Sequence, residues 1–564
     1  MLRLTSQLTA FSATTAVFVA TVLVTPAIAG DDTVIEGQSV DRLPRTETEF
    51  VTGLNDPVVA FINERIRMGW EDNEVSPSSL ASDEEWLRRV TLDLAGRIPT
   101  VPEVREFVAA EDPAKRADVI DRLLDSEDFI EHWSTQWTNL LIGRNAPQRT
   151  NRDGLLKFLR DSIALGRPWD DITADLITAE GHFEENGAVN FLLAKLDGNP
   201  RDEDYHVEAT ASVTRLFLGM QVQCTQCHNH PFNDWKQDQF WEFNSFMRQI
   251  RRVDHREGNT DLYSELVPLN YDGPVYFEKR SGLMQVAYPL YFGEQVDPGP
   301  ETDRRAEFAR LLTEAADGEN LLARAFVNRT WSQLYGYAFT RPVDDMGPHN
   351  PPSHPELLDR LTGEFVDSGY DVRQLVRWMA NAEAYNLTSA FLRDGSNSYD
   401  DPAAGEVPLF SHAYVKSLSA EQLYDSLVVA TGAVEGLSGE QGERVRERWL
   451  RDFLRIFGGN EDDEPTLFAG SIPQALLMMN GQLVEQALDG EGESVFKSVI
   501  EDGSMNDGER VEALYVAALG RRPSRKESSA ISKALARTSG EEKLWLMQDL
   551  YWALLNSNEF IFNH

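Results

Sequence analysis

Apolar residues recur every three or four positions along most of the chain, which is the spacing of one face of an α-helix. The first run is Val58, Val59, Ile62 and Ile66. Further runs of this kind cover about 114–142, 153–178, 205–222 and 304–338, and they continue from about 355 to the C-terminus. These runs predict a mainly α-helical protein.

Local polar signals mark where some of these helices begin and end. Ser82 and Glu85 have the spacing of a capping box before an apolar run, and Gly96 follows the run as a helix-ending residue. Thr100 and Glu103 repeat the capping box. One helix is therefore expected between residues 82 and 96, and a second is expected to begin near residue 100.

The period of the pattern changes between residues 265 and 298. Val275 and Phe277 alternate with polar residues, as does the stretch 284–288, and Ser281-Gly282 lies between them. This alternation predicts a β-hairpin or a small sheet near 265–298. The stretch 297–303 is rich in Pro, Gly and Asp and predicts a linker. The expected organisation is a helical domain over 53–260, a β-rich connector and linker over 261–303, and a second helical domain over 304–564.

The N-terminus has the composition of an export signal. Arg3 precedes an uncharged stretch from Phe11 to Val24, and Ala27-Ile28-Ala29 offers a small-residue cleavage site. We expect a signal peptide over 1–29, a disordered polar leader over 30–52 and a periplasmic or extracellular protein. No later segment approaches 18 uninterrupted apolar residues, so no membrane span is expected after cleavage.

The chain is strongly acidic, with a formal net charge of −39. Such a charge repels phosphate backbones, which argues against nucleic-acid binding, and it also disfavours docking on anionic lipid. It is compatible with attraction of a cationic redox partner protein.

Cys224 and Cys227 are the only two cysteines, and His228 follows them directly. Cys-Thr-Gln-Cys-His has the spacing that attaches one covalent haem c, in which two thiols bind the porphyrin edge and the histidine binds the iron. We therefore predict an exported haem c protein that acts in electron transfer or redox-linked binding, with His228 as the proximal iron ligand. Candidates for the distal ligand are Met220, Met247, His230 and His354.

Two other interpretations stay open at this stage. Cys224 and Cys227 could form a disulfide in a haem-free extracytoplasmic scaffold protein that binds a glycan or another exported protein. The pair could also form half of a zinc site together with His228 and His230.

A second group of polar residues lies in the loop 342–355. It combines two carboxylates and two imidazoles, which could bind a metal ion and support a metal-dependent hydrolase. These residues are Asp344, Asp345, His349 and His354. The alternative is structural, because Ser353 and Glu356 have capping-box spacing with Pro355 in the first turn.

Several motifs resemble those of one exported protein family. They are Arg88-Arg-Val-Thr-Leu-Asp-Leu-Ala-Gly-Arg-Ile-Pro-Thr, Gln223-Cys-Thr-Gln-Cys-His-Asn-His-Pro-Phe, Asn328-Arg-Thr-Trp, the Asp344–Leu357 loop, Ser419-Ala-Glu-Gln-Leu, Ser471-Ile-Pro-Gln-Ala-Leu, Leu519-Gly-Arg-Arg-Pro and Leu554-Leu-Asn-Ser-Asn-Glu-Phe. The chain is similar to exported planctomycete cytochrome-associated proteins, which carry two tandem domains of unknown function. The resemblance implies the tandem arrangement and supplies no activity.

Overall fold

A computed structural model describes residues 56–564 except for 148, 315–319, 433–448, 452, 455–480, 482–483, 486–487 and 489–493. The predicted signal peptide (1–29), the leader (30–52) and the Ser471 motif lie outside the described residues. Helices dominate and the sheets are small and antiparallel, which confirms the predicted mainly α-helical class. None of the helices in the described part of the chain combines the length and the apolar content needed to cross a bilayer.

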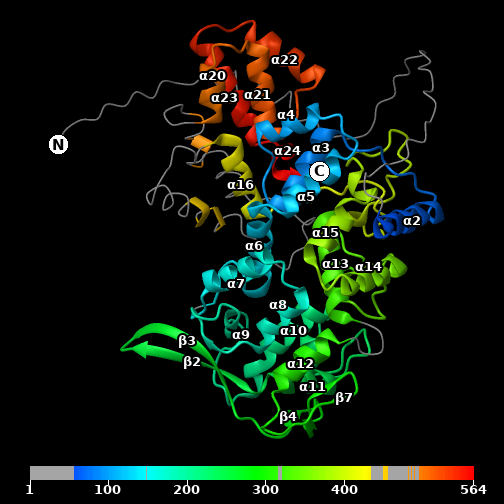
Figure 1. The fold of residues 1–564 in the computed structure, drawn as a ribbon, viewed down its shortest axis with the longest axis vertical. Helices are drawn as coiled ribbons and strands as arrows, with labels where there is room; N and C mark the ends of the chain where they lie inside the picture. The colour runs from blue at the N-terminus through cyan, green and yellow to red at the C-terminus, as the bar shows by residue number, and fades with distance from the viewer. Residues whose placement is uncertain are drawn as a thin grey trace, which may run out of the picture.

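The helices fall on either side of the β-rich middle of the chain (Figure 1). Those before it are α2 (Pro57–Asp72), α3 (Asp83–Ala95), α4 (Val101–Ala109), α5 (Lys115–Leu124), α6 (Glu127–Ile142), α7 (Arg152–Ala164), α8 (Trp169–Thr178), α9 (Val189–Leu193), α10 (Val207–Leu218) and α11 (Gln237–Met247). Those after it are α12 (Arg304–Thr313), α13 (Leu321–Tyr335), α14 (Pro355–Asp367), α15 (Val372–Ala380), α16 (Ala420–Thr431), α20 (Val495–Glu501), α21 (Asp507–Leu519), α22 (Arg525–Leu535), α23 (Glu541–Leu555) and α24 (Asn558–Ile561).

The helix ends predicted near residue 82 are present, with one difference. Ser82 accepts a hydrogen bond from the Glu85 N–H, and Gly96 ends α3 in the left-handed conformation. The Glu85 side chain does not return to Ser82, so the predicted capping box is only half formed. Thr100 and Glu103 form the complete box at the start of α4.

Within the described residues, the strands lie in four small sheets. They are β1 (Gly181–His182), β2 (Ile250–Glu257), β3 (Thr260–Pro268), β4 (Val275–Glu278), β5 (Met284–Ala287), β6 (Leu290–Tyr291), β7 (Glu294–Gln295), β8 (Lys416–Ser417) and β9 (Phe562–Asn563). β4 and β5 form the predicted hairpin, with Val275 opposite Ala287. β2 lies before 260, inside the stretch predicted to be helical. β2 and β3 pair as a projecting arm (Figure 1), so charged residues such as Arg251 can occupy a strand without an apolar period.

One hydrophobic core takes residues from both predicted helical domains. Trp137 of α6 stacks on Phe326 of α13 with ring centroids 5.5 Å apart, and Trp169 lies 4.5 Å from the same ring. A second core contains apolar residues of α16 and α20–α24 together with Leu92 and Ile98. The division at 260 and 304 stays a prediction, since the first core crosses it.

The two ends of the described chain repeat one motif. α3 and α21 each end at a glycine in the left-handed region, and φ is 71° at both Gly96 and Gly520. Each glycine is followed by an arginine, Arg97 or Arg521, and then by a proline and a capping box that begins the next helix. The offset of 424 residues is too long for a solenoid period.

The repeated arginine makes the same contacts in both copies. Arg97 binds Glu103 with two hydrogen bonds, of 2.9 and 3.1 Å, and donates to Asp128 at 2.8 Å. Arg521 binds Glu527 at 3.0 and 3.1 Å, and its Nη2 donates to Glu559 at 2.7 Å. Each arginine therefore ties the start of one helix to the start of a later one through bidentate, charge-assisted bonds.

Candidate functional site

The two cysteines lie on η2 (Gln223–Gln226), a 3₁₀ turn that follows α10, and its C-cap. Both thiols are exposed and free, so the disulfide of the scaffold interpretation is not formed in this structure. Thr225 between them is buried and donates to the Val222 carbonyl at 2.5 Å. The two thiols therefore face solvent, and the Thr225 hydroxyl lies on the buried side of the turn.

Helix α11 fixes the position of this turn. The carbonyl of Gln226 accepts hydrogen bonds from the indole N–H of Trp241 at 3.1 Å and from the side-chain amide of Gln237 at 3.0 Å. Gln237 is buried, and its amide also donates to the Glu278 carbonyl in β4 at 3.0 Å. A single glutamine therefore links the cysteine turn to the β4–β5 hairpin.

The two histidines after the turn are held in different ways. His228 is exposed, and its Nδ1 donates to the Asn229 carbonyl at 2.7 Å. His230 is half-buried, and its Nδ1 accepts from the N–H groups of Phe232 and Asn233 at 3.3 and 3.1 Å. Burial lowers the pKa of His230, while the nearby carboxylate of Asp345 acts in the opposite direction.

The predicted second group is brought next to the first. The N–H of Met346 donates to the Gly219 carbonyl at 2.7 Å, which docks the loop 344–349 on the turn before the cysteines. Asp345 accepts from His349 at 3.1 Å, and the rings of His349 and His230 lie 5.9 Å apart. Two patterns about 120 residues apart in the sequence therefore form one surface.

Asp344 has a different role from its neighbour Asp345. Its carboxylate is buried, accepts a 2.5 Å hydrogen bond from Gln221 and lies 3.6 and 3.7 Å from Arg215 and Arg329. Asp344 therefore ties this loop to α10 and α13.

The thiol of Cys224 is not activated. Although Cys224 is exposed, partial desolvation of the thiol raises its pKa, and the negative charge of Asp345 raises it further. A thiol with a raised pKa stays protonated at neutral pH and is a poor nucleophile.

The residues predicted as distal iron ligands are scattered. Met220 is half-buried against the main core, and Met247 is buried inside it. His354 is buried at the N-cap of α14, against Phe339 and Phe410, and burial lowers its pKa to about 4. The predicted capping box of Ser353 is wrong, because His354 is the N-cap and makes no side-chain cap bond.

The prediction of a haem-binding electron-transfer protein is wrong. In the described ranges, no group of three or more His, Cys, Asp and Glu side chains is arranged to hold a metal ion. The physical reason is local: His228 lies at the surface with its Nδ1 bonded to the next residue, and the inner side of the cysteine turn is filled by Thr225 and α11. The same finding contradicts the zinc and hydrolase alternatives. The Asp344 carboxylate lies beside Arg215 and Arg329, and the His354 ring packs against Phe339 and Phe410.

A buried polar centre on α3 was not predicted. Asp93 is surrounded by three donors: Lys416 Nζ at 2.6 Å, Tyr385 Oη at 2.7 Å and Asn563 Nδ2 at 2.7 Å. Burial raises the pKa of Asp93 and lowers that of Lys416. Three distant parts of the chain therefore meet at one carboxylate.

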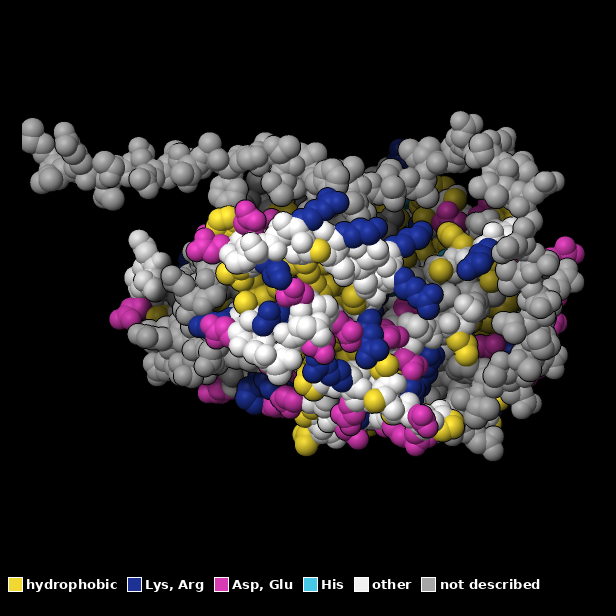
Figure 2. Space-filling view, turned by 90° about the horizontal axis from the view of Figure 1, so that it is seen from above, with side chains coloured by type: hydrophobic (Ala, Val, Ile, Leu, Met, Phe, Trp, Pro, Cys, Tyr) yellow, Lys and Arg dark blue, Asp and Glu magenta, His cyan; other side chains and the backbone are white. Residues whose placement is uncertain are grey.

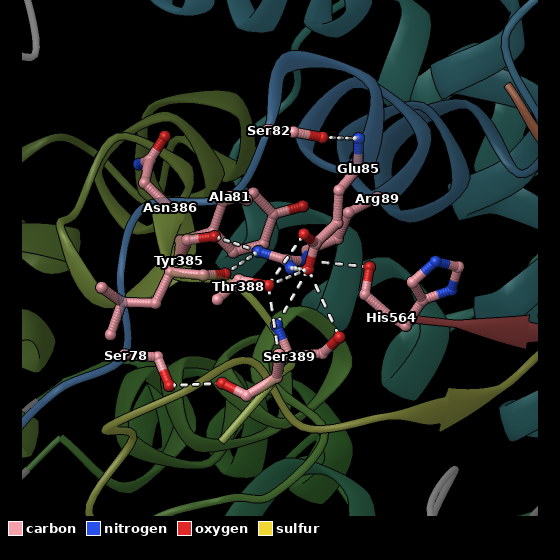
Figure 3. Close-up of polar contacts among 12 residues, drawn as sticks. Ser78, Ala81, Ser82, Glu85, Arg89, Tyr385, Asn386, Thr388, Ser389 and His564 are labelled. Atoms are coloured by element: carbon pink, nitrogen blue, oxygen red, sulfur yellow. Dashed lines mark hydrogen bonds and ion pairs between the residues drawn. The ribbon is translucent and has the colours of Figure 1, made fainter. Parts of the chain in front are cut away.

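Arg89, one turn before Asp93 on α3, adds a second network to this centre, and Figure 3 shows its contacts with Glu85, Tyr385 and His564. It donates to the carbonyls of Tyr385 and Leu387 at 2.7 Å each and to the Glu85 carboxylate at 3.1 Å. Glu85 also accepts from the Thr388 hydroxyl at 2.8 Å. The signal in the sequence was the run Arg88-Arg-Val-Thr-Leu-Asp, which places charged residues inside an apolar helix. In the structure every residue from 86 to 95 is buried.

The arrangement around Asp93 is suited to joining segments. Its donors come from the turn before residue 386, from β8 and from β9, while Arg89 also lies 3.4 Å from the His564 carbonyl. The adjacent cavity, lined by Tyr335, Tyr414 and Lys416 among others, has room for about one water molecule. We therefore assign this centre to structure.

Comparison with known families gives two matches, one in each half of the chain. Residues 61–252 match the family described as PSCyt2, Protein of unknown function (DUF1549), and residues 304–452 match PSD1, Protein of unknown function (DUF1553). No curated protein and no solved structure matches the chain. The chain therefore carries two domains of unknown function in tandem, which confirms the tandem arrangement implied by its motifs.

Proposed function

We propose that this chain is a protein-binding unit, and that a partner protein docks at the β4–β5 end of the molecule, mainly on the segment between the two matched domains of unknown function. Seven large apolar side chains are exposed on the segments around α11, and we call this set the apolar face. It consists of Phe232, Tyr276, Leu283, Met284, Val286, Tyr288 and Phe292. Their concentration carries the proposal, because large uncovered apolar patches on soluble proteins mark interaction sites.

The β4–β5 hairpin has one face in the core and one in solvent. Tyr276 pairs with Val286 across the strands, and both side chains are exposed, as is Met284 two residues before Val286. The inner face carries Phe277, which stacks on Trp241 of α11 with ring centroids 5.5 Å apart. Since α11 covers the inner face, the apolar side chains of the outer face add nothing to the core and are available to a partner.

Phe292 joins the hairpin to the loop that carries Phe232. Its ring lies 5.8 Å from that of Trp235 and 5.4 Å from that of Phe243. Phe292 has φ of 45°, a left-handed conformation that costs a non-glycine residue about 1 kcal/mol. The fold therefore maintains a strained turn whose side chain stays 41% exposed, and such strain tends to occur where a site uses it.

The charge of the chain indicates the chemistry of the partner. The net charge is −39, and the segments that carry the apolar face expose Asp272, Glu278 and Glu294, with Lys279 and Arg280 in the turn of the hairpin. A partner with an apolar contact surface and a basic rim matches this pattern. Attraction between the opposite charges would speed association and would weaken as salt is added.

We further propose that the interaction takes place outside the cytoplasm. This proposal rests on the signal-like composition of residues 1–29, and the closer placement among exported planctomycete proteins rests on the quoted motifs. N-terminal sequencing of the protein recovered outside the cytoplasm should begin at Gly30. A chain that retains Met1 in the cytoplasm would contradict export.

Site-specific crosslinking tests the docking proposal. A photoreactive phenylalanine analogue replaces Tyr276 in the native host, and the same analogue replaces Tyr399 as the control, because Tyr399 is 79% exposed and lies outside the apolar face. We expect one adduct from position 276 and none of that mass from position 399. Mass spectrometry identifies the adduct, and the purified partner should reproduce it.

The double variant Met284→Glu, Val286→Glu gives the decisive comparison. Both side chains are exposed, so the fold should be kept while the apolar contact is lost. We expect the adduct at position 276 to disappear, and added salt to reduce it in the parent chain. An adduct of two copies of this chain, the same adduct from position 399, or an adduct that survives the double variant would contradict the proposal.

A further inference from the structure

The C-terminal helices carry a basic segment on an acidic protein. Residues 521–537 contain six Arg and Lys residues and one glutamate, a local charge of +5 in a chain whose net charge is −39. This segment covers the turn after α21, helix α22 and the residues that follow it. Its charge is therefore opposite to that of the molecule as a whole.

Only two of these basic residues form ion pairs with other described residues of the protein. Arg521 binds Glu527 and Glu559, and Arg522 lies 3.0 Å from Glu512. The remaining basic side chains are exposed, and among the described residues none of them takes part in an ion pair. They are Arg525, Lys526, Lys533 and Arg537, which we call the basic face.

The helix places this charge on one side. Lys526 and Lys533 are seven residues apart, which is two turns or about 10 Å along the helix axis. Small side chains, Ser529 and Ala530, lie between them. Leu535 is the one fully buried residue of α22, so most of the helix surface is left to solvent.

Apolar side chains are exposed beside the basic face. Five residues, 536–540, connect α22 to α23, and α23 carries Leu544 and Trp545 directly after Glu541, Glu542 and Lys543 of its first turn. These side chains are 36% and 51% exposed. Tryptophan is enriched where proteins meet the headgroup region of a bilayer, with Lys and Arg beside it to contact anionic lipid. An acidic polymer would bind the basic residues but would gain no apolar contact from the exposed indole of Trp545.

The position of this surface removes the objection raised by the net charge. α22 lies at one end of the longest axis of the molecule (Figure 1), and Lys and Arg side chains are spread across that end, with Asp and Glu side chains among them, when it is viewed directly (Figure 2). At physiological salt, charges are screened beyond about 8 Å. A flat anionic surface that contacts this end is therefore influenced mainly by the charges at this end, which include the basic face, and not by the net charge of the whole chain.

We propose that the basic face, together with Leu544 and Trp545, docks this protein on an anionic membrane surface. Lys526, Lys533 and Arg537 would contact lipid phosphates, and the Trp545 ring would lie at headgroup depth. Binding is peripheral and separate from the apolar face at the β4–β5 end. A protein docked in this way keeps that opposite end directed away from the bilayer.

Vesicle co-sedimentation of the full chain tests this proposal. The vesicles contain roughly one-third anionic lipid in one series and only neutral lipid in the other, at about 0.15 M salt. We expect binding to the anionic vesicles alone. Replacing Lys526 and Lys533 with Ala should reduce the partition coefficient by roughly 25-fold, at about fivefold for each charge. Trp545→Ala should also reduce it.

The matched control is Lys157→Ala with Arg280→Ala, which removes two exposed basic residues elsewhere and should change nothing. Circular dichroism verifies that each variant is folded. Equal binding to neutral vesicles, binding that the Lys526 and Lys533 variant keeps, or no binding to either vesicle overturns the proposal. Displacement from vesicles by soluble polyglutamate, together with unchanged binding of Trp545→Ala, would identify an anionic polymer as the ligand instead.

Discussion

Asp93 and Lys416 form an ion pair that is almost completely removed from water, with side chains 3% and 6% exposed. The ammonium also donates to the carbonyls of Gln333 and Leu334, at 2.9 and 2.7 Å. Each partner alone would favour its neutral form, since burial raises the pKa of Asp93 and lowers that of Lys416. The pair is therefore stable only while both charges and their hydrogen bonds are present.

Lys416→Met should lower the free energy of unfolding by about 3–5 kcal/mol, because it leaves a buried carboxylate without its cation. Urea unfolding followed by circular dichroism measures the change. Lys279→Met is the control, since the Lys279–Asp238 pair is partly exposed and should contribute about 1 kcal/mol or less. A loss no greater in Lys416→Met than in the control would contradict the buried pair.

His354 provides a pH-dependent prediction. Its pKa is about 4 in the folded protein and near 6.5 in an unfolded chain, so folding favours the neutral ring. Its contribution to stability is complete above pH 6.5 and is lost as the pH falls toward 4. Between these limits the folded protein should lose roughly 3 kcal/mol relative to His354→Gln, measured by urea unfolding at several pH values. His228→Gln, at an exposed site, should follow the parent protein.

Local sequence patterns predicted the position of some functional and structural side chains but not of others. The spacing of Cys224, Cys227 and His228 marked a surface site, and the loop with Asp345 and His349 proved to lie against it. The chemistry inferred from that spacing was wrong, because a motif does not describe what surrounds it. Asp93 and Lys416 are 323 residues apart, and no local pattern shows such a pair.

At the level of elements, the repeated helix–glycine–arginine motif allows a matched test of backbone and packing. Gly96 and Gly520 share a φ of 71°, so an added Cβ meets the same backbone strain at both, about 1–2 kcal/mol. Their surroundings differ. The Cβ would lie 2.4 Å from His132 Nδ1 at Gly96, but 3.7 Å from its nearest neighbour, Pro99 Cγ, at Gly520.

Gly96→Ala should therefore destabilise the protein more than Gly520→Ala, by about 1–3 kcal/mol beyond the shared strain, because the buried His132 ring must move. Urea midpoints of the two variants measure the difference. Equal losses of stability in the two variants would show that backbone strain alone determines the effect of the added Cβ in both copies of the motif.

Helices were more predictable than strands for a physical reason. A helix buried on one side repeats apolar residues with its own period, and caps such as Thr100–Glu103 depend on residues three positions apart. β4 and β5 also followed their alternation, since α11 covers one face. β2 carries charged residues on an arm that projects from the body, so burial imposed no pattern on it.

Across the whole molecule, the C-terminal helices return to the first helices of the chain. Arg88 of α3 is buried and donates to the carbonyls of Ala518, Glu559 and Phe560, at 3.4, 3.2 and 2.8 Å. Burial lowers its pKa to about 10, so it stays charged at neutral pH. One guanidinium therefore joins the end of α21 and helix α24 to α3. The tandem order of the two matched families gave no sign of this contact.

Arg88→Met should loosen the C-terminal helices without unfolding the rest. Its loss leaves three carbonyls without this donor, in two buried hydrogen bonds and one partly buried one, which should lower the free energy of local opening by about 2–3 kcal/mol. Amide hydrogen exchange in α21 (Asp507–Leu519) and α23 (Glu541–Leu555) should become roughly 30- to 150-fold faster, while α10 and α11 keep their protection. Arg522→Met, which removes an exposed ion pair with Glu512, is the matched control and should leave all rates unchanged. Uniformly faster exchange in every helix would mean that Arg88 supports a single cooperative unit, because only a separable C-terminal unit can open while α10 and α11 stay closed.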